Sequence, residues 1–149
     1  MVLELLTVVV LGLMCGSELN VAAFSHPALK RQPLQAHIYA RSALASLLGH
    51  VMPFWMAAST LLNFLLLLVG GLGGRAWRFA AIAFAIQVLA VLLSLIGPVP
   101  INKRIAQWRP ETLPIDWQAQ EHRWEVYHWV RTALLIGAFT ILTLSMELH

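Results

Sequence analysis

The chain has 149 residues, and 59% of them are hydrophobic while only 11% are charged. A soluble domain carries about 25% charged residues, so this composition excludes an ordinary water-exposed surface and leaves lipid as the cover of most of the outside. The net charge of +3 does not indicate a nucleic-acid partner, because the basic residues cluster at the ends of apolar segments, where they set the orientation in a membrane.

Four apolar segments are long enough to cross a bilayer, which takes about 20 predominantly apolar residues. They cover about residues 2–24, 43–69, 77–97 and 124–146. Backbone polar groups surrounded by lipid have to bond within their own segment, so each span is expected to be a helix. The sequence therefore predicts an all-α fold, a transmembrane four-helix bundle with two polar loops on one side, forming a single integral membrane domain over residues 1–149.

The first segment has no Lys or Arg before its apolar part, and Glu4 has the wrong charge for the start of a signal peptide, so we expect a retained span. Gly12 and Gly16 form a G-x-x-x-G pair, which allows a neighbouring helix to approach closely and could mediate a homo-oligomer. The only cysteine, Cys15, excludes an intrachain disulfide and is expected to fill space in the core.

Glu18 lies in the same span, roughly six residues or about 9 Å from its expected end. A charged residue inside lipid is costly, so it is a functional candidate by default. Arg131, Arg41 and Arg123 are expected on the same side of the membrane. An ion pair with one of these arginines and a role as a catalytic base both remain open.

The helix of the second span is expected to begin near Leu34, before the lipid. His37 and Arg41 are four residues apart, so they share a helix face. His50 lies nine residues beyond Arg41 and points to the opposite side of a straight helix, at ~100° per residue. Pro53 could bend the helix nearby. We expect His50 to be buried, either as a metal ligand or bonded to a neighbouring helix.

Glycines at positions 70, 71, 73 and 74 predict a tight turn before the third span. After that span, four prolines are expected to keep the polar segment out of a long helix, namely Pro98, Pro100, Pro110 and Pro114.

The last helix is expected to begin a turn or two before its span, and five of its residues recur at spacings of four, three, four and three, which places them on one stripe. They are Trp117, Glu121, Trp124, His128 and Arg131. His128 could move a proton while Arg131 holds a phenolate or oxyanion. The alternative is that Arg131 reaches the lipid headgroups, with interface tryptophans around it.

Metal motifs with a specific spacing are not found in the sequence. Glu125 and His128 are three residues apart and could bind a metal ion together with a residue of another span, such as His50. His50 or His128 could also serve as the axial ligand of a haem. The expected cofactor is therefore none, or a single metal ion or haem.

The basic residues predict the orientation in the membrane. Those expected on the loop side are Lys30, Arg31, Arg41, Lys103, Arg104, Arg109, Arg123 and Arg131. Only Arg75 and Arg78 are expected on the opposite side. Loops between spans that are rich in Lys and Arg stay in the cytoplasm. We therefore expect a bacterial inner-membrane protein with both termini outside and the loops 25–41 and 98–123 in the cytoplasm.

The second half of the chain contains a specific set of short motifs, namely Pro98-Val-Pro-Ile-Asn-Lys, Trp108, Asp116-Trp117, Arg123-Trp124, His128 and Arg131. This set resembles the anthrone-oxygenase-like family of small four-helix membrane proteins. Gly16, Phe24-Ser-His-Pro-Ala-Leu and Met52-Pro53 are also similar, so the resemblance covers nearly the whole chain. Characterised members of that family oxidise anthrones to anthraquinones with molecular oxygen. By their match to the motifs, the residues that carry over are Asn102, Trp108, Trp117, Arg123, Trp124, His128 and Arg131.

Three hypotheses follow from the residues and the resemblance together. The first is an oxidoreductase that acts on a lipophilic phenolic or quinone-like aromatic, with His128 or Glu18 as base and Arg131, helped by Asn102, stabilising the enolate. Its substrate contacts would be Asn102, Trp108, Trp117, Trp124, Arg41 and His37. The second is a metal- or haem-binding membrane redox protein. The third is a non-enzymatic binding protein or partner subunit in the lipid bilayer.

Overall fold

The computed structural model describes residues 2–70 and 74–147, and no strand occurs among them. Its helical elements in chain order are α1 (Val2–Asn20), η1 (Val21–Ser25), α2 (His26–Lys30), α3 (Leu34–Val69), α4 (Arg75–Ile96), α5 (Pro98–Ile105), η2 (Pro110–Thr112) and α6 (Trp117–Met146). Residues 71–73 of the predicted glycine turn lie outside the described part.

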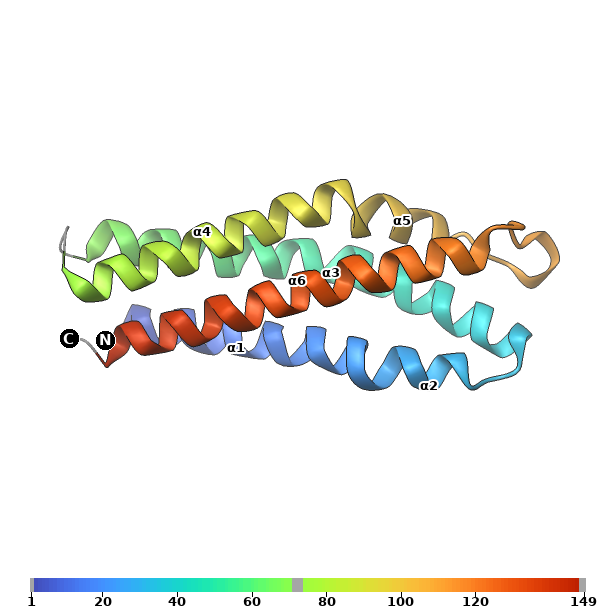
Figure 1. Ribbon diagram of the computed structural model, residues 1–149, viewed down its shortest axis with the longest axis horizontal. Helices are drawn as coiled ribbons and strands as arrows, with labels where there is room; N and C mark the ends of the chain where they lie inside the picture. Colours follow the sequence, from blue (N-terminus) through green and yellow to red (C-terminus); the bar gives the residue numbers. More distant parts are fainter. Residues whose placement is uncertain (1, 71–73, 148–149) are drawn as a thin grey trace.

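Among the described residues, four helical segments are long and apolar enough to cross a membrane, which confirms the predicted fold class. They are Val2–Lys30, Leu34–Val69, Arg75–Ile96 and Trp117–Met146. They run side by side as a bundle, with the start of α1 and the end of α6 at one end and the turn between α2 and α3 and the loop between α5 and α6 at the other (Figure 1).

α3 extends well beyond the lipid on the loop side. α3 has 36 residues, which is about 54 Å at 1.5 Å per residue, whereas the hydrocarbon core of a bilayer is about 30 Å thick. It begins at Leu34, as predicted, and continues through Pro53. The first predicted loop is therefore helical except for residues 31–33.

α1, η1 and α2 form one continuous segment, and the middle part, η1, is a π-helix. Its wider turn inserts a π-bulge, a feature that is frequent at functional sites. The sequence predicted Glu18 near the end of this helix. Because the segment continues to Lys30, Glu18 instead lies well inside it.

The segment after α4 is not a long helix, as its prolines predict, but it does form the short helix α5. Pro98 and Pro100 lie in its first turn, where a proline is tolerated because the missing N–H would have no partner there. Ile101 and Ile105 of α5 are buried and pack in a cluster with Trp108 and Trp124. α5 therefore covers the loop-side end of the bundle.

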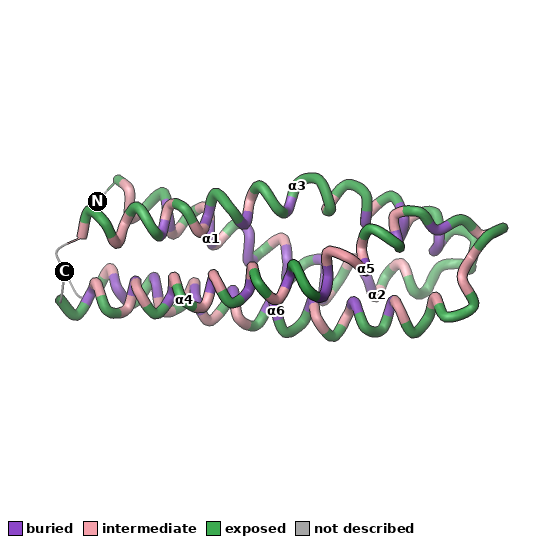
Figure 2. Tube along the Cα trace, turned by 90° about the horizontal axis from the view of Figure 1, so that it is seen from above, coloured by how far each residue is buried: buried purple, intermediate pink, exposed green. Residues whose placement is uncertain are grey.

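The main core lies between the four long helices (Figure 2). α4 packs on α6, and α1 contacts both α6 and α3. Small residues on α4 allow this close packing, and the buried members of the core are Leu11, Met14, Cys15, Met52, Met56, Ala80, Ala83, Ala90, Leu135, Ala138 and Leu142. Cys15 is thus a core residue, as expected.

The two glycines of the G-x-x-x-G pair differ in their surroundings. A Cβ at Gly12 would lie 2.9 Å from Cε2 of Phe139, so Gly12 already accommodates α6 of the same chain. A Cβ at Gly16 would meet no atom within 4 Å. Of the two, Gly16 is therefore the more open position, and a homo-oligomer through this face stays a prediction.

Candidate functional site

The polar stripe of α6 faces the interior of the bundle, as predicted. Glu121, Trp124, His128 and Arg131 are buried, and Trp117 is partly buried. Arg131 does not reach the headgroups, because its guanidinium pairs with a carboxylate inside the bundle. This pairing supports the prediction of a polar site over the alternative of a snorkelling arginine.

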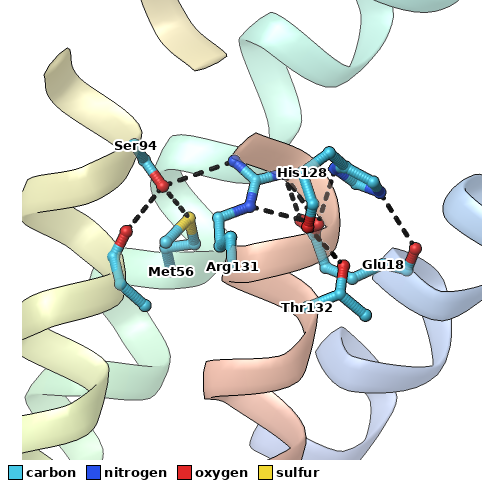
Figure 3. A network of polar contacts seen from close by, with 7 residues as sticks. Glu18, Met56, Ser94, His128, Arg131 and Thr132 are labelled. Carbon is cyan, nitrogen blue, oxygen red and sulfur yellow. Dashed lines mark hydrogen bonds and ion pairs between the residues drawn. The ribbon is translucent and has the colours of Figure 1, made fainter. Parts of the chain in front are cut away.

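The partner of Arg131 is Glu18 of α1 (Figure 3). Nη2 of Arg131 donates to Oε1 and Oε2 of Glu18 at 2.9 and 2.7 Å, and Nε donates to Oε2 at 3.2 Å. The Glu18 side chain is 1% exposed and that of Arg131 is 8% exposed. Of the three arginines considered from the sequence, the structure thus selects Arg131.

His128 completes this group, which we call the inner cluster (Glu18, His128 and Arg131). Its Nε2 lies 3.1 Å from the backbone oxygen of Glu18, and its Nδ1 lies 3.0 Å from Nη2 of Arg131. A carbonyl oxygen only accepts and a guanidinium only donates. The contacts therefore fit a neutral imidazole with its hydrogen on Nε2. Nδ1, which is also 3.2 Å from Oε2 of Glu18, is the atom that can take a proton.

Neighbouring hydroxyl groups hold the inner cluster in place (Figure 3). Nη1 of Arg131 donates to Oγ of Ser94 at 3.4 Å, and that hydroxyl donates to the backbone oxygen of Ala90 at 2.7 Å. Oγ1 of Thr132 donates to the backbone oxygen of His128 at 2.8 Å. Through its bond to Ser94 of α4, the inner cluster of α1 and α6 thus connects three helices.

The inner cluster forms part of the wall of a cavity of about 520 Å³, which lies within the range of about 300–1,000 Å³ that is usual for small-molecule sites. The other lining residues are mostly apolar and come chiefly from α3, α4 and α5. They include Met52, Pro53, Met56, Val91, Leu95, Pro98 and Val99. The cavity is therefore a largely apolar space with a few polar groups at fixed positions.

Asn102 of α5 lines the same cavity. Its Nδ2 donates to the backbone oxygen of Ala45 at 2.7 Å, while its Oδ1 is buried without a partner. A Cβ at Gly49 would lie 3.1 Å from Nδ2, so this glycine leaves room for the amide. One hydrogen of the NH₂ group is thus bonded to α3, and the other is left for a ligand.

Trp124 connects the inner cluster to a second polar group. Its ring stacks on that of His128, with centroids 4.5 Å apart and planes 12° apart. The guanidinium carbon of Arg41 lies 4.2 Å from the centroid of Trp124, which is within the range of a cation–π contact. Arg41 and Arg131 therefore do not share a ligand but are linked through Trp124 and His128.

The second group, which we call the outer network, lies towards the loop side and consists of His26, Lys30, His37, Arg41, Glu121 and Glu125. Oε1 of Glu121 lies 3.2 Å from Nε2 of His26, 3.0 Å from Nε2 of His37 and 3.7 Å from Nε of Arg41. Nε of Arg41 also donates to Nε2 of His26 at 3.1 Å.

Glu125 forms the outer edge of this network. Its Oε1 lies 2.9 Å from Nδ1 of His26 and also pairs with Lys30. The network thus fixes α2 and α3 to the first turns of α6.

The predicted metal ligands do not come together. Glu125 lies in the outer network, whereas His128 belongs to the inner cluster. His50 lines the cavity but is exposed, and it bonds to Ser46 of its own helix and not to a neighbouring helix. The expectation that His50 is buried is therefore wrong. Over residues 2–70 and 74–147, no three His, Cys, Asp or Glu side chains are grouped so that they could hold a metal ion.

The remaining predicted contacts lie near the outer network. Trp108 is buried and meets Trp117 edge to face, with centroids 6.1 Å apart. The ring of His37 lies 6.0 Å from that of Trp117. None of these three residues lines the cavity, and neither does Arg41. Arg123 is exposed on the surface of α6.

Two functional partners were missed by the sequence reasoning. Ser94 had no role there, and His26 appeared only as part of the motif Phe24-Ser-His-Pro-Ala-Leu. Both make their contacts with residues far away in the chain, such as Arg131 and Glu121. No local motif marks such residues, although a serine within an apolar span is a weak signal of a polar contact between helices.

Comparison with known proteins gives one match. The sequence pattern of the anthrone oxygenase family matches residues 44–141. This segment contains His128, Arg131, Asn102 and Trp124, whereas Glu18 precedes it. The match is thus narrower than the resemblance expected over nearly the whole chain. No curated protein and no solved structure matches the chain.

Proposed function

Because the chain belongs to the anthrone oxygenase family, we propose that it is a membrane-embedded oxidoreductase that oxidises a lipophilic phenolic or anthrone-type aromatic with molecular oxygen. One observation carries this proposal. A largely apolar cavity of about 520 Å³ has Glu18, His128 and Arg131 in its wall. These residues supply a proton acceptor and a fixed positive charge next to space for a flat apolar molecule.

The position of the cavity suits a substrate that is dissolved in the membrane. Pro53, Ala57 and Leu95 line the cavity and are also exposed on the outside of their helices. All three lie within membrane-spanning segments, so their exposed sides face lipid. A lipophilic aromatic could therefore reach the cavity from the bilayer, between α3 and α4, without crossing water.

The proposed reaction begins with removal of a proton from the substrate. In an anthrone, the CH₂ group between two aryl rings gives a stabilised enolate. Oε2 of Glu18 and Nδ1 of His128 lie 3.2 Å apart, so a proton taken by the carboxylate can pass to the imidazole. The guanidinium of Arg131 then stabilises the enolate oxygen. Asn102 can help in this task with the second hydrogen of its NH₂ group, because only one bond from Nδ2, to Ala45, is made within the chain.

The enolate supplies the electrons that reduce oxygen. Overall, R₂CH₂ and O₂ give R₂C=O and H₂O, so one oxygen atom becomes the new carbonyl and the other leaves as water. The four electrons lost by the carbon are those gained by O₂. The chain's own residues bind the aromatic, remove and return the proton, and exclude water from the anion.

Oxygen uptake with anthrone as the substrate tests the proposal. The protein is placed in lipid nanodiscs, and protein-free nanodiscs correct for spontaneous oxidation. We expect His128→Gln to lower the rate by about 10²–10⁴-fold, the usual contribution of a positioned acid–base group. His122→Gln is the matched control, because this histidine of α6 has a side chain that is 76% exposed.

Unchanged oxygen uptake by His128→Gln would argue against the mechanism. If the protein binds anthrone but takes up no oxygen, the non-enzymatic binding role is favoured. A metal ion or a haem absorption band in the purified protein would direct attention to the redox alternative.

A further inference from the structure

We propose that Nε2 of His50 accepts a hydrogen bond from a hydroxyl group of the molecule bound in the cavity, so that the site selects aromatics with a free hydroxyl. The proposal rests on the proposed function, since it concerns the same cavity. It gives His50 the role of a substrate-binding and specificity-determining residue in place of the predicted role of a metal ligand.

The first argument is the location of His50. It lies in a stretch from Ser42 to Gly74 that contains no Asp, Glu, Lys or Arg, and it is exposed on a membrane-spanning helix. A polar side chain at such a depth is costly in lipid and usually faces the bundle interior or a cavity. His50 meets this condition, because it lines the cavity that also contains Arg131.

The second argument is the orientation of the ring. Nδ1 of His50 lies 2.6 Å from the backbone oxygen of Ser46. A carbonyl oxygen only accepts, so Nδ1 carries a hydrogen, and in the neutral ring the lone pair is then on Nε2. No residue of the described chain bonds to Nε2. The helix itself therefore selects the tautomer of the neutral ring in which Nε2 is a free acceptor.

The cavity thus has two histidines whose hydrogens are held by backbone carbonyls. In His128 the bonded atom is Nε2, and the free basic atom, Nδ1, is directed to Glu18 and Arg131. In His50 the bonded atom is Nδ1. His128 is buried and His50 is exposed. This difference suits His128 for proton transfer within the inner cluster and His50 for contact with a substituent of the ligand.

An acceptor in this position discriminates between substituents. A phenolic hydroxyl can donate to Nε2, whereas a methoxy group has no hydrogen and brings its own lone pairs against the nitrogen. A site that hydrogen-bonds a hydroxyl rejects the analogue without one, because its polar group is then left unpaired. The expected ligand class is therefore a flat apolar aromatic with at least one hydroxyl that is not bonded within the molecule.

The test compares 2-hydroxyanthraquinone with 2-methoxyanthraquinone, whose binding to protein in nanodiscs is followed by absorbance. Protein-free nanodiscs correct for partition into lipid. We expect the wild type to bind the hydroxyl compound about five- to tenfold more tightly, which corresponds to one net hydrogen bond. His50→Phe should bring this ratio to about one while leaving the affinity for the methoxy compound nearly unchanged.

Two variants serve as controls. Ser46→Ala keeps the backbone oxygen that orients His50, and should keep the ratio. His50→Gln again supplies an acceptor and should restore part of it. His50→Phe is expected to fold, because its ring is apolar and the position is exposed to lipid.

Each remaining outcome has a defined meaning. The inference is wrong if the wild type binds both compounds equally. It is also wrong if His50→Phe keeps the ratio of the two affinities, or weakens the binding of both compounds to the same extent. In these cases the proposed function stands. If neither compound binds to the wild type, the proposed function itself loses its support, and the inference falls with it.

Discussion

The carboxylate of Glu18 accepts hydrogen bonds from Nε and Nη2 of Arg131, at 3.2 and 2.7 Å, although 113 positions separate the two residues in the chain. The pair joins the first and last membrane-spanning helices and lies in the wall of the cavity. Both side chains are almost completely shielded. The same contact therefore links two helices of the bundle and sets the charges in the wall of the candidate site.

Breaking this pair from one side should be strongly destabilising. Glu18→Gln and Arg131→Met each leave a charged group, or a half-satisfied one, in a buried position, and we expect a loss of about 3–5 kcal/mol in the free energy of unfolding. The double variant should lose less than the sum of the two, because no unpaired charge remains. Denaturant-induced unfolding in micelles measures all three. Strictly additive losses would show that the pair is not coupled.

The contact between Arg41 and Trp124 gives a second prediction. Arg41→Lys keeps the positive charge but removes the planar group over the ring and the bond from Nε to His26. We expect a loss of about 1–2 kcal/mol in the free energy of unfolding. Arg31→Lys, at an exposed position of the turn between α2 and α3, is the control and should have no measurable effect. Equal stability of both variants would show that the guanidinium geometry is unimportant.

The sequence was sufficient to predict the four spans and the interior stripe of α6, because hydropathy and helical periodicity depend only on neighbouring residues. It was also sufficient to place His50 away from Arg41. It did not identify which arginine pairs with Glu18, since periodicity gives the face of a helix but not its neighbour. The same limit applies to Ser94 and His26, whose partners belong to other helices.

The error at His50 has a related cause. Depth along the helix was taken to mean burial, yet Arg41 faces the interior and residues nine positions apart lie on opposite sides of a helix. With Arg41 inside, His50 lies on an exposed face of α3, where it lines the cavity. The end of the first helical segment and the helix α5 were not predicted, for a different reason. Prolines in the first turn of α5 do not prevent a short helix, and helices continue beyond the lipid when polar contacts such as those of Glu121 stabilise them.

The junction between α4 and α5 gives a third prediction. A Cβ at Gly97 would lie 2.8 Å from Cγ and Cδ1 of Tyr127, atoms near the base of that side chain. Gly97→Ala should therefore destabilise the bundle by about 1–3 kcal/mol through overpacking. Gly137→Ala is the matched control, because its Cβ would meet no atom within 4 Å.

A second change should relieve this clash. Tyr127→Ala makes room for the new methyl group. Tyr127→Ala should therefore lower the free energy of unfolding less in the Gly97→Ala variant than in the wild type. If Gly97→Ala and Gly137→Ala unfold at the same denaturant concentration, the close approach of Tyr127 has no energetic consequence.

The G-x-x-x-G pair gives a fourth prediction about assembly. Gly12→Val should destabilise the folded chain by about 1–3 kcal/mol, because the larger side chain meets Phe139. Gly16→Val should leave the fold intact, since the position is open. If a homo-oligomer forms through this face, Gly16→Val should shift it towards the monomer in cross-linking or light scattering. An oligomer that withstands Gly16→Val would have to use another surface.

The orientation in the membrane follows from the charges that the bundle leaves at its ends. Of the ten Lys and Arg residues, Arg41 and Arg131 are buried in internal contacts and cannot be counted as surface charges. Six of the others lie at the loop end, namely Lys30, Arg31, Lys103, Arg104, Arg109 and Arg123, against Arg75 and Arg78 at the end with the termini. This excess still predicts a cytoplasmic loop end.

Thiol labelling measures the orientation directly. In a Cys15→Ser background, Gln32→Cys places a thiol at the loop end and Gly74→Cys places one at the opposite end, both at exposed positions. A membrane-impermeant maleimide should label Gly74→Cys in intact spheroplasts of the expressing bacterium, and Gln32→Cys only after the membrane is opened. The reverse pattern would place the termini in the cytoplasm. In that case, internal contacts would have to outweigh the charge difference in setting the topology.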